Sequence, residues 1–365
     1  MTTFTAAAPA VALPPARKAV FTPPIDTLAI GGVSIAVFLV MLLVPAATGQ
    51  AFSLKRFLIL EALLNWPHFT ASWVLLYGSR ETYERHRWAA IHVPIALVAY
   101  GIFALAMASR TRLFLDLSGL VTSCYLAVHY TGQAWGMVAT STFLAGMPVA
   151  PLERRLLRAS LWIFLAWQIA WNLHFFGFFT APSLVHLGPD KSVLLALFRF
   201  MSALTPIAIG LGVTGFALLR RRVGRALPAR VYVPWLAICL WYAALGRYPN
   251  AIYWVQLSHA TQYMLFPIRV ETNRHRARAS DPARGASARH GLALHMAFYL
   301  AAIVGSGWLI YAGVESISPH QGPLAHLPFM VSNIVNIHHY FTDVVVWKIR
   351  NPAVRRELFA HLSRA

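Results

Sequence analysis

Apolar runs of about twenty residues recur from one end of the chain to the other, separated by short segments that contain charged residues, proline or glycine. A helical run of this length crosses the apolar part of a bilayer, because each helical residue adds about 1.5 Å. The runs predict ten spanning helices, at residues 27–47, 57–79, 88–109, 113–147, 156–180, 192–219, 231–247, 249–268, 290–313 and 324–347. We therefore expect an all-α protein, a polytopic transmembrane helical bundle.

Two of these runs are irregular. The fourth is longer than the roughly 20 residues that one crossing needs, so we expect it to tilt, to break near Gly132–Gly136 or to end early. The seventh is short and contains Pro234, and a tight turn at Arg247–Pro249 separates it from the eighth. These two runs therefore depart in length from a single regular crossing.

Charge gives the orientation of the predicted spans. Membrane proteins concentrate Lys and Arg in their cytoplasmic loops. With the N-terminus inside, 24 of the 31 Lys and Arg residues fall on the inner side and six on the outer side, while Arg199 lies within a span. This alternation predicts that both termini are cytoplasmic, in a multi-pass protein of a bacterial-type inner membrane. The net charge of +19 follows from the same rule, so we expect no nucleic-acid partner.

Composition divides the chain into three parts. Residues 1–26 are rich in Ala and Pro and predict a disordered arm, residues 27–347 form the transmembrane domain, and residues 348–365 form a basic cytoplasmic tail. The two cysteines, Cys124 and Cys239, lie in apolar runs and predict neither a disulfide framework nor a thiolate metal site. No Rossmann, Walker or Gly-x-Ser-x-Gly motif occurs, so nucleotide chemistry and hydrolysis by such a serine have no support.

Polar residues form ordered stripes inside four predicted spans. The stripes are Glu61, Asn65, His68 and Ser72; Thr122, Tyr125, His129, Gln133 and Gly136; Gln256, His259 and Tyr263 with Gln262 beside them; and Ser332, Asn336, His339 and Asp343 with His338 adjacent. Spacings of three and four residues place each stripe on one helix face. Polar groups at this depth are costly, so they usually face the bundle interior and serve packing or function.

Four histidines in these stripes, His68, His129, His259 and His339, lie near the middle of four different spans. Neutral imidazole is the commonest metal ligand, and its second nitrogen needs an oriented partner. We therefore predict a metal site with these four ligands and His338 as an alternate. The neighbouring polar residues would orient the ligands or line the site, and these are Asn65, Gln133, Gln262, Tyr263, Asn336 and Asp343. Glu61 is a candidate acid or proton carrier.

Simpler interpretations stay open for several of these residues. A lone histidine inside a membrane is more often a packing residue than a ligand. Asp343 also lies near the predicted inner surface, where a carboxylate can be solvated or paired. His92, His174 and His295 are further histidines within the predicted spans, and the sequence does not decide whether any of them joins the site.

The ligand set limits the choice of metal. Imidazoles without thiolates suit Fe, Cu or Zn, and open coordination positions suit non-haem Fe(II) and O₂ chemistry. Two of the helices would also be able to hold a haem between two histidines. Aromatic residues flank the histidines, among them Trp66, Phe69 and Tyr130. We expect Fe(II) as the cofactor, O₂ and a lipophilic molecule as the substrates, and lipid as the surroundings.

Three short patches resemble the bacterial Brp/Blh-type membrane carotene dioxygenases. The patches are Asn65-Trp66-Pro67-His68-Phe69, Val128-His129-Tyr130 with Gln133 and Gly136, and Ser258-His259-Ala260-Thr261-Gln262-Tyr263. The resemblance implies an all-helical protein that binds non-haem iron through histidines of different spans and cleaves a carotenoid with O₂. A membrane transporter or channel is the alternative, in which the intramembrane His, Glu and Asp residues form an ion or proton pathway.

Overall fold

The structure is a computed structural model that describes residues 18–44, 59–175, 190–280, 291–347 and 352–362. All regular secondary structure in these residues is helical, and no strand occurs among them. The longer helices are α2 (Val33–Leu43), α5 (Trp66–Tyr77), α7 (Val93–Met107), α8 (Leu113–Leu144), α9 (Pro151–Phe175), α10 (Lys191–Ala203), α11 (Thr205–Val223), α12 (Ala229–Arg247), α13 (Ile252–Ala279), α14 (Leu292–Ile317) and α15 (Leu327–Val346). Shorter helices are α1 (Pro23–Thr27), α6 (Arg80–Arg85) and α16 (Pro352–Phe359).

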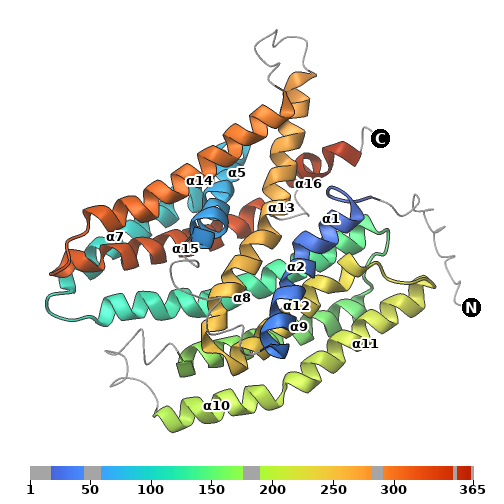
Figure 1. Cartoon of the computed structure of the whole chain (residues 1–365), viewed down its shortest axis with the longest axis horizontal. Coiled ribbons are helices and arrows are strands. Elements are labelled where there is room, and N and C mark those ends of the chain that lie inside the picture. Colours follow the sequence, from blue (N-terminus) through green and yellow to red (C-terminus); the bar gives the residue numbers. More distant parts are fainter. Residues whose placement is uncertain (1–17, 45–58, 176–189, 281–290, 348–351, 363–365) are drawn as a thin grey trace, which may run out of the picture.

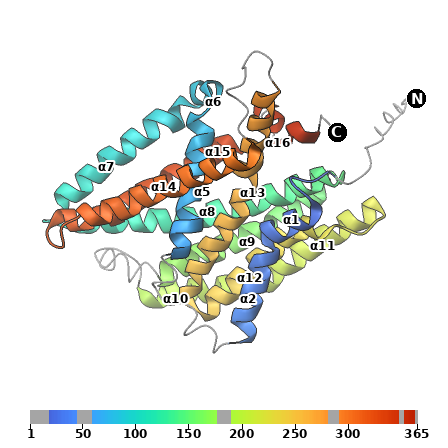
Figure 2. The ribbon, with the colours of Figure 1, turned by 45° about the horizontal axis from the view of Figure 1, so that its top comes forward.

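The helices form two groups that share two long helices. Helices α5, α7, α14 and α15 pack together on one side, and α2, α9, α10, α11 and α12 pack together on the other (Figure 1). Helix α8 contacts members of both groups, and α13 packs against α5 and α14 and also against the turn that precedes α2 (Figure 2). Polar residues of α8 and α13 can therefore meet those of α5 and α15 in the interior.

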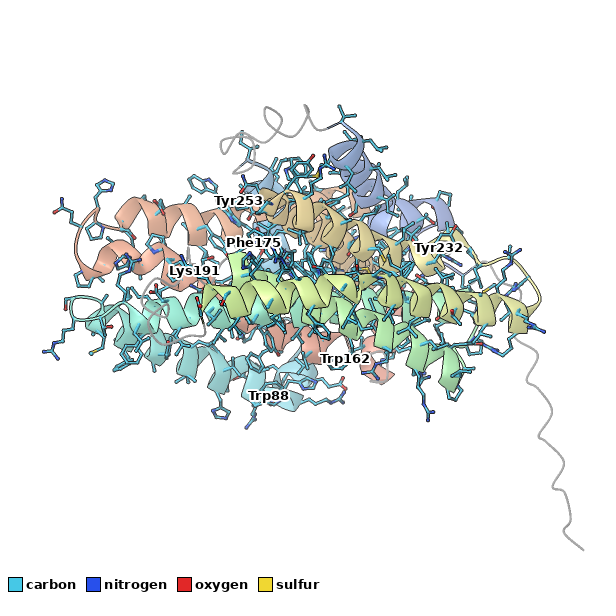
Figure 3. All side chains as sticks on the ribbon, turned by 90° about the horizontal axis from the view of Figure 1, so that it is seen from below. Trp88, Trp162, Phe175, Lys191, Tyr232 and Tyr253 are labelled. Carbon is cyan, nitrogen blue, oxygen red and sulfur yellow. The ribbon has the colours of Figure 1, made fainter. Side chains whose placement is uncertain are left out.

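Six helical segments are long and apolar enough to cross a membrane. They are Pro23–Leu43, Trp88–Met107, Leu113–Leu144, Lys191–Val223, Ala229–Arg247 and Leu292–Ile317. Large aromatic side chains on the outer surface, such as Trp88, Trp162 and Tyr232 (Figure 3), expose 42%, 57% and 37% of their area. Exposed apolar surface on this scale is typical of a protein whose surroundings are lipid. The chain is therefore membrane-embedded.

The predicted spans at α5, α9, α13 and α15 do not meet the same length and hydropathy criterion. Three of these four helices, α5, α13 and α15, carry the predicted metal ligands His68, His259 and His339. Polar groups at membrane depth lower the mean hydropathy of a span, and they are kept there only where they are useful. The helices that carry these three predicted ligands are thus less apolar than an ideal membrane span.

Several predicted helix ends differ from the structure. Helix α8 does not break near Gly132–Gly136 but continues for 32 residues, a length of about 48 Å at 1.5 Å per residue. Helix α13 does not end near residue 268 but runs to Ala279, so part of the predicted inner loop is helical. The sixth run divides at Leu204 into α10 and α11, because Pro206 is disfavoured inside a helix.

Both ends of the described chain dock on the bundle. Residues 18–26 belong to the predicted arm, yet the Asp26 carboxylate accepts hydrogen bonds from the backbone N–H groups of Val20 (2.7 Å) and Phe21 (2.9 Å). Residues 1–17 lie outside the described residues. In the predicted tail, α16 packs against α13, where the Asn273 side chain donates to the Leu358 carbonyl. Part of the predicted arm and part of the predicted tail are therefore ordered.

Two π-helical turns, Glu61–Asn65 and Trp88–His92, directly precede helices that contain a proline at their second residue. Proline has no N–H and clashes with the carbonyl four residues before it, and a wider turn removes that clash. The second turn has a further consequence, because Pro94 leaves nearby carbonyls without a backbone donor. The Tyr77 hydroxyl donates to Ala90 O at 2.8 Å, and His338 Nε2 donates to Ala89 O at 3.0 Å.

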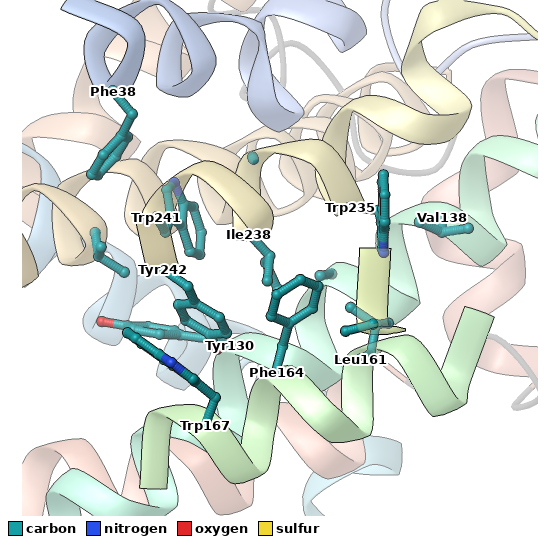
Figure 4. Packing of buried hydrophobic residues seen from close by; sticks show 14 of the residues in the cluster. Phe38, Tyr130, Val138, Leu161, Phe164, Trp167, Trp235, Ile238, Trp241 and Tyr242 are labelled. Carbon is teal, nitrogen blue, oxygen red and sulfur yellow. The ribbon is translucent and has the colours of Figure 1, made fainter. Parts of the chain in front are cut away.

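An aromatic core holds the second group of helices together (Figure 4). Its indoles pair their N–H groups with nearby oxygens: Trp241 donates to Ser34 Oγ at 2.5 Å and Trp235 donates to Ser160 Oγ at 2.9 Å. On the other side, α14 approaches α5 closely at Gly307, where a Cβ would lie 2.8 Å from the Cβ of Trp66. This contact fixes α5, and with it His68, against the bundle.

Candidate metal centre

Four imidazoles from four helices meet in the interior: His68 of α5, His129 of α8, His259 of α13 and His339 of α15. Ring centroids lie 4.6 Å apart for His68 and His339 and for His129 and His259, and 4.9 Å apart for His129 and His339. All four side chains are buried. The structure thus brings together the four histidines that the stripes predicted as ligands.

Hydrogen bonds fix which nitrogen of His68 faces the cluster. His68 Nδ1 contacts the backbone carbonyl oxygen of Asn65, so this nitrogen carries the proton and donates it. The lone pair of the neutral ring is then on Nε2, which is buried without a hydrogen-bond partner. Asn65 therefore orients His68 as predicted, but with its backbone rather than with its carboxamide.

Ser72 fixes the tautomer of His339 in a similar way. The Ser72 hydroxyl donates to the carbonyl of Phe69 at 2.7 Å, which uses its only proton. Ser72 Oγ must therefore accept from His339 Nδ1, 3.0 Å away. The lone pair of His339 is consequently on Nε2, which is also buried without a hydrogen-bond partner. Ser72 is a site residue that was not among the predicted ones, although its spacing of four from His68 places it on the same helix face.

His129 and His259 present their Nε2 atoms to one another at 3.0 Å. Two nitrogens that bind one ion at about 2.1 Å lie roughly 3.0–3.4 Å apart, because the angle between them is about 90–109°. The observed separation is close to that of two ligands on a single ion. It also fits a hydrogen bond between the two rings, in which one Nε2 donates and the other accepts.

Asp343 brings a carboxylate to the same imidazoles. Its Oδ2 lies 3.4 Å from His339 Nε2 and 3.7 Å from His129 Nε2, and its Oδ1 accepts a hydrogen bond from the Tyr263 hydroxyl at 3.0 Å. The His339 lone pair thus faces a carboxylate oxygen, and two acceptors in a buried site repel one another unless a cation or a proton lies between them. Asp343 therefore belongs to the cluster and is paired there.

Ligand atoms in this cluster form two groups with a geometry that suits a metal ion. One group is His68, His259 and His339, and the other is His129, His339 and Asp343. His339 belongs to both, so the five residues surround one region. Five nitrogen and oxygen donors without sulfur suit Fe, Cu or Zn.

Two glutamines support the cluster from α8 and α13. Gln133 Nε2 donates to the backbone carbonyl of His259 at 3.2 Å and to Gln262 Oε1 at 3.3 Å. These bonds connect the two helices that carry His129 and His259. Aromatic rings fill the remaining space, with Tyr340 4.6 Å from His129 and Tyr130 4.7 Å from His259 between ring centroids.

Three other predicted site residues lie outside the cluster. The His338 side chain bonds to Ala89 O at the second π turn, which gives it a structural role. Glu61 accepts from Asn65 Nδ2 at 2.7 Å, while its second carboxylate oxygen is buried without a hydrogen-bond partner. Asn336 donates to Ser332 of its own helix at 2.8 Å and accepts from the Tyr340 hydroxyl at 3.3 Å. Asn336 therefore connects to the cluster through Tyr340, which packs against His129.

The histidines left open by the sequence do not belong to either metal-binding group. His92 is exposed, and His174 stacks on Phe198 with ring centroids 5.5 Å apart. His295 Nε2 lies 2.8 Å from a carboxylate oxygen of Glu271 near the end of α13.

A cavity of about 550 Å³ adjoins the cluster. His129, Asp343 and Tyr263 line one part of it, and the remaining lining residues are Gly132, Gln133, Gly136, Met137, Thr140, Arg158, Phe266, Val344, Trp347 and Leu358. Most of these residues are apolar or are glycines, which have no side chain. Pockets of about 300–1,000 Å³ with mostly apolar walls and a few polar groups are typical of small-molecule sites.

Comparison of the chain with family models, with curated proteins and with solved structures gave no match. The resemblance to the Brp/Blh-type dioxygenases therefore stays a prediction from the short histidine patches.

Proposed function

We propose that the chain is an integral-membrane metalloenzyme that uses non-haem Fe(II) and O₂ to oxidise or cleave a lipophilic, carotenoid- or lipid-like substrate. The observation that carries this proposal is that His129, His339 and Asp343 come together beside a largely apolar cavity, with His129 and Asp343 on its wall. Two histidines and one carboxylate with open coordination positions are the ligand set of many non-haem iron oxygenases. Iron bound there would supply O₂ binding and activation.

The position of each residue in the site would determine its role. His129 and Asp343 line the cavity and would face the substrate, whereas His68 and His259 would hold the ion from other directions. The Tyr263 hydroxyl would keep the Asp343 carboxylate in place through its hydrogen bond. Cleavage of one carbon–carbon double bond by one O₂ gives two carbonyl products and needs no external reductant.

Ring packing favours a single ion over haem. A haem with two histidine ligands needs a flat slot for the porphyrin between the two imidazoles. In this cluster, edges and faces of the rings contact one another, with ring centroids 4.6–5.2 Å apart. Zn or Cu would fit the same donors, so the metal must be identified by analysis.

Metal analysis of the purified protein tests the proposal. We expect about one iron per chain that survives washing with a chelator, no Soret band, and consumption of O₂ when β-carotene or an unsaturated lipid is supplied in nanodiscs. Products formed under ¹⁸O₂ should carry the label. Metal that exchanges freely during washing, with no oxygen uptake, would favour the transporter instead.

The proposal includes the predicted topology, with ten spans and both termini on the cytoplasmic side of a bacterial-type inner membrane. The excess of Lys and Arg on the predicted inner side supports it. A C-terminal alkaline phosphatase fusion should be inactive and a C-terminal green fluorescent protein fusion fluorescent. The opposite result would contradict this topology, because it would require an odd number of spans or the reversed orientation.

A further inference from the structure

The cavity beside the cluster contains two charged residues, and they belong to different helices. Asp343 of α15 lies among the imidazoles, whereas Arg158 lies two turns into α9, which begins at Pro151. Arg158 is exposed, so it stands where the cavity meets its surroundings. The cavity therefore has a metal-binding part and a positively charged part.

Arg158 has no acidic partner among the described residues. The contrast with its own helix is clear, because Glu153 of α9 pairs with Arg222 of α11 through contacts of 2.7 Å and 2.9 Å. A guanidinium binds carboxylate and phosphate groups in a fork of parallel hydrogen bonds. Arg158 is thus available to a negatively charged group at the mouth of the cavity.

One face of α8 connects the two parts. His129, Gly132, Gly136 and Thr140 follow each other at spacings of three and four residues and all line the cavity. A Cβ at either glycine would meet nothing within 4 Å, so the missing side chains leave open space. From His129 to Thr140 the helix rises about 16 Å at 1.5 Å per residue. This length suits an extended apolar chain and not a compact polar molecule.

We propose that the cavity binds an amphiphile whose anionic group, a carboxylate or a phosphate, pairs with Arg158 while its apolar chain lies along the glycine face of α8. The far part of the chain then lies at His129 and Asp343. This inference rests on the proposed function for the metal, but the binding of the amphiphile can be measured without turnover.

The test uses protein in nanodiscs of zwitterionic lipid and stearic acid that carries a spin label near its methyl end. Electron paramagnetic resonance measures the immobilised fraction. We expect the wild type to bind the acid more tightly than its methyl ester, and Arg158→Gln to reduce this preference roughly two- to fivefold, the range of an ion pair at an exposed site. Arg155→Gln, an exposed arginine on α9 that does not line the cavity, is the matched control.

Two further measurements give the direction and the source of the ligand. With a paramagnetic ion in the cluster, a label near the methyl end should relax faster than a label near the carboxylate. Spin-labelled phosphatidylglycerol compared with the free acid shows whether the anionic group belongs to a membrane lipid.

Gly136→Leu should abolish binding of acid and ester alike, because it fills the space beside α8.

The outcomes separate this inference from the proposed function. The inference is overturned if wild type and Arg158→Gln prefer the acid over the ester to the same extent. It is also overturned if neither anionic probe binds, even when the protein holds iron. Preferential binding of an anionic probe by protein that holds no metal upholds the inference and contradicts the proposed function. Metal content is therefore measured in every sample, and Arg158→Gln should leave it unchanged.

Discussion

The aromatic core around α9 and α12 and the imidazole cluster between α5, α8, α13 and α15 are both buried, but their ring nitrogens differ in hydrogen bonding. In the aromatic core, the indole N–H groups of Trp167, Trp235 and Trp241 each donate to a serine hydroxyl. In the cluster, lone-pair nitrogens of His68 and His339 are left without partners.

Paired polar groups, as in the aromatic core, stabilise the fold, whereas unpaired buried nitrogens, as in the cluster, are available to bind a ligand. An unpaired buried acceptor costs about 1–3 kcal/mol, so a native protein rarely keeps several of them together. In the aromatic core, each serine hydroxyl accepts from an indole N–H group, so neither group is left unpaired. A cation would remove that cost in the cluster, because each unpaired nitrogen would then become a ligand.

Removal of a ligand should give the largest effect. His259→Ala should abolish most of the bound metal, with a loss of affinity above the roughly 100-fold that changes outside the ligand set produce. His338→Ala is the control, because its side chain bonds to Ala89 O and not to the cluster. Metal content is measured by mass spectrometry of the purified proteins. Full occupancy in His259→Ala would make the cluster a packing feature like the aromatic core.

Asp343→Asn should have the next largest effect. The amide keeps the shape and one oxygen but removes the negative charge that faces His339 and His129, so metal affinity should fall about 10–100-fold. Tyr263→Phe removes only the hydrogen bond to Oδ1 and should weaken binding less. Metal titrations of both variants measure the difference. Unchanged affinity in Asp343→Asn would exclude the carboxylate from the site.

Trp241→Phe tests the aromatic core. This change leaves the buried Ser34 hydroxyl without its indole donor, so the free energy of unfolding should fall by about 1–3 kcal/mol while metal content stays the same. Trp162→Phe is the control, because this side chain is 57% exposed on the outer surface. Unfolding in mixed micelles gives the stabilities. A loss of metal in Trp241→Phe would show that the two regions are coupled.

The smallest effect is expected for the ion pair between α9 and α11. Hydrogen bonds from Arg222 lower the pKa of the Glu153 carboxyl below its usual 4.5. A carboxyl whose pKa is lower in the folded state stabilises the fold above pH 4.5, and this contribution disappears as the pH falls further. Glu153→Gln should therefore reduce stability by about 0–1 kcal/mol at pH 7. The difference from wild type should shrink in melting curves recorded below pH 4.

Local patterns were sufficient for the membrane helices and for most of the residues in the cluster. The runs at α7, α12 and α14 are predominantly apolar, and such segments become helices in a bilayer because no other local structure satisfies the backbone. Spacings of three and four residues also placed His68, His129 and His339 on polar faces. The sequence alone therefore determined which helix faces have to be hidden from lipid.

Tertiary packing decided how those faces are used. His338 and His339 are neighbours on α15, yet one satisfies a carbonyl freed by Pro94 and the other joins the cluster. The sequence could not distinguish them, because the carbonyl belongs to a different helix. Likewise the pairing of Asp343 with Tyr263 and the cavity that connects His129 to Arg158 depend on how α8, α9, α13 and α15 cross. Periodicity specifies the face of a helix, whereas the partner of each group on that face is set by the neighbouring helices.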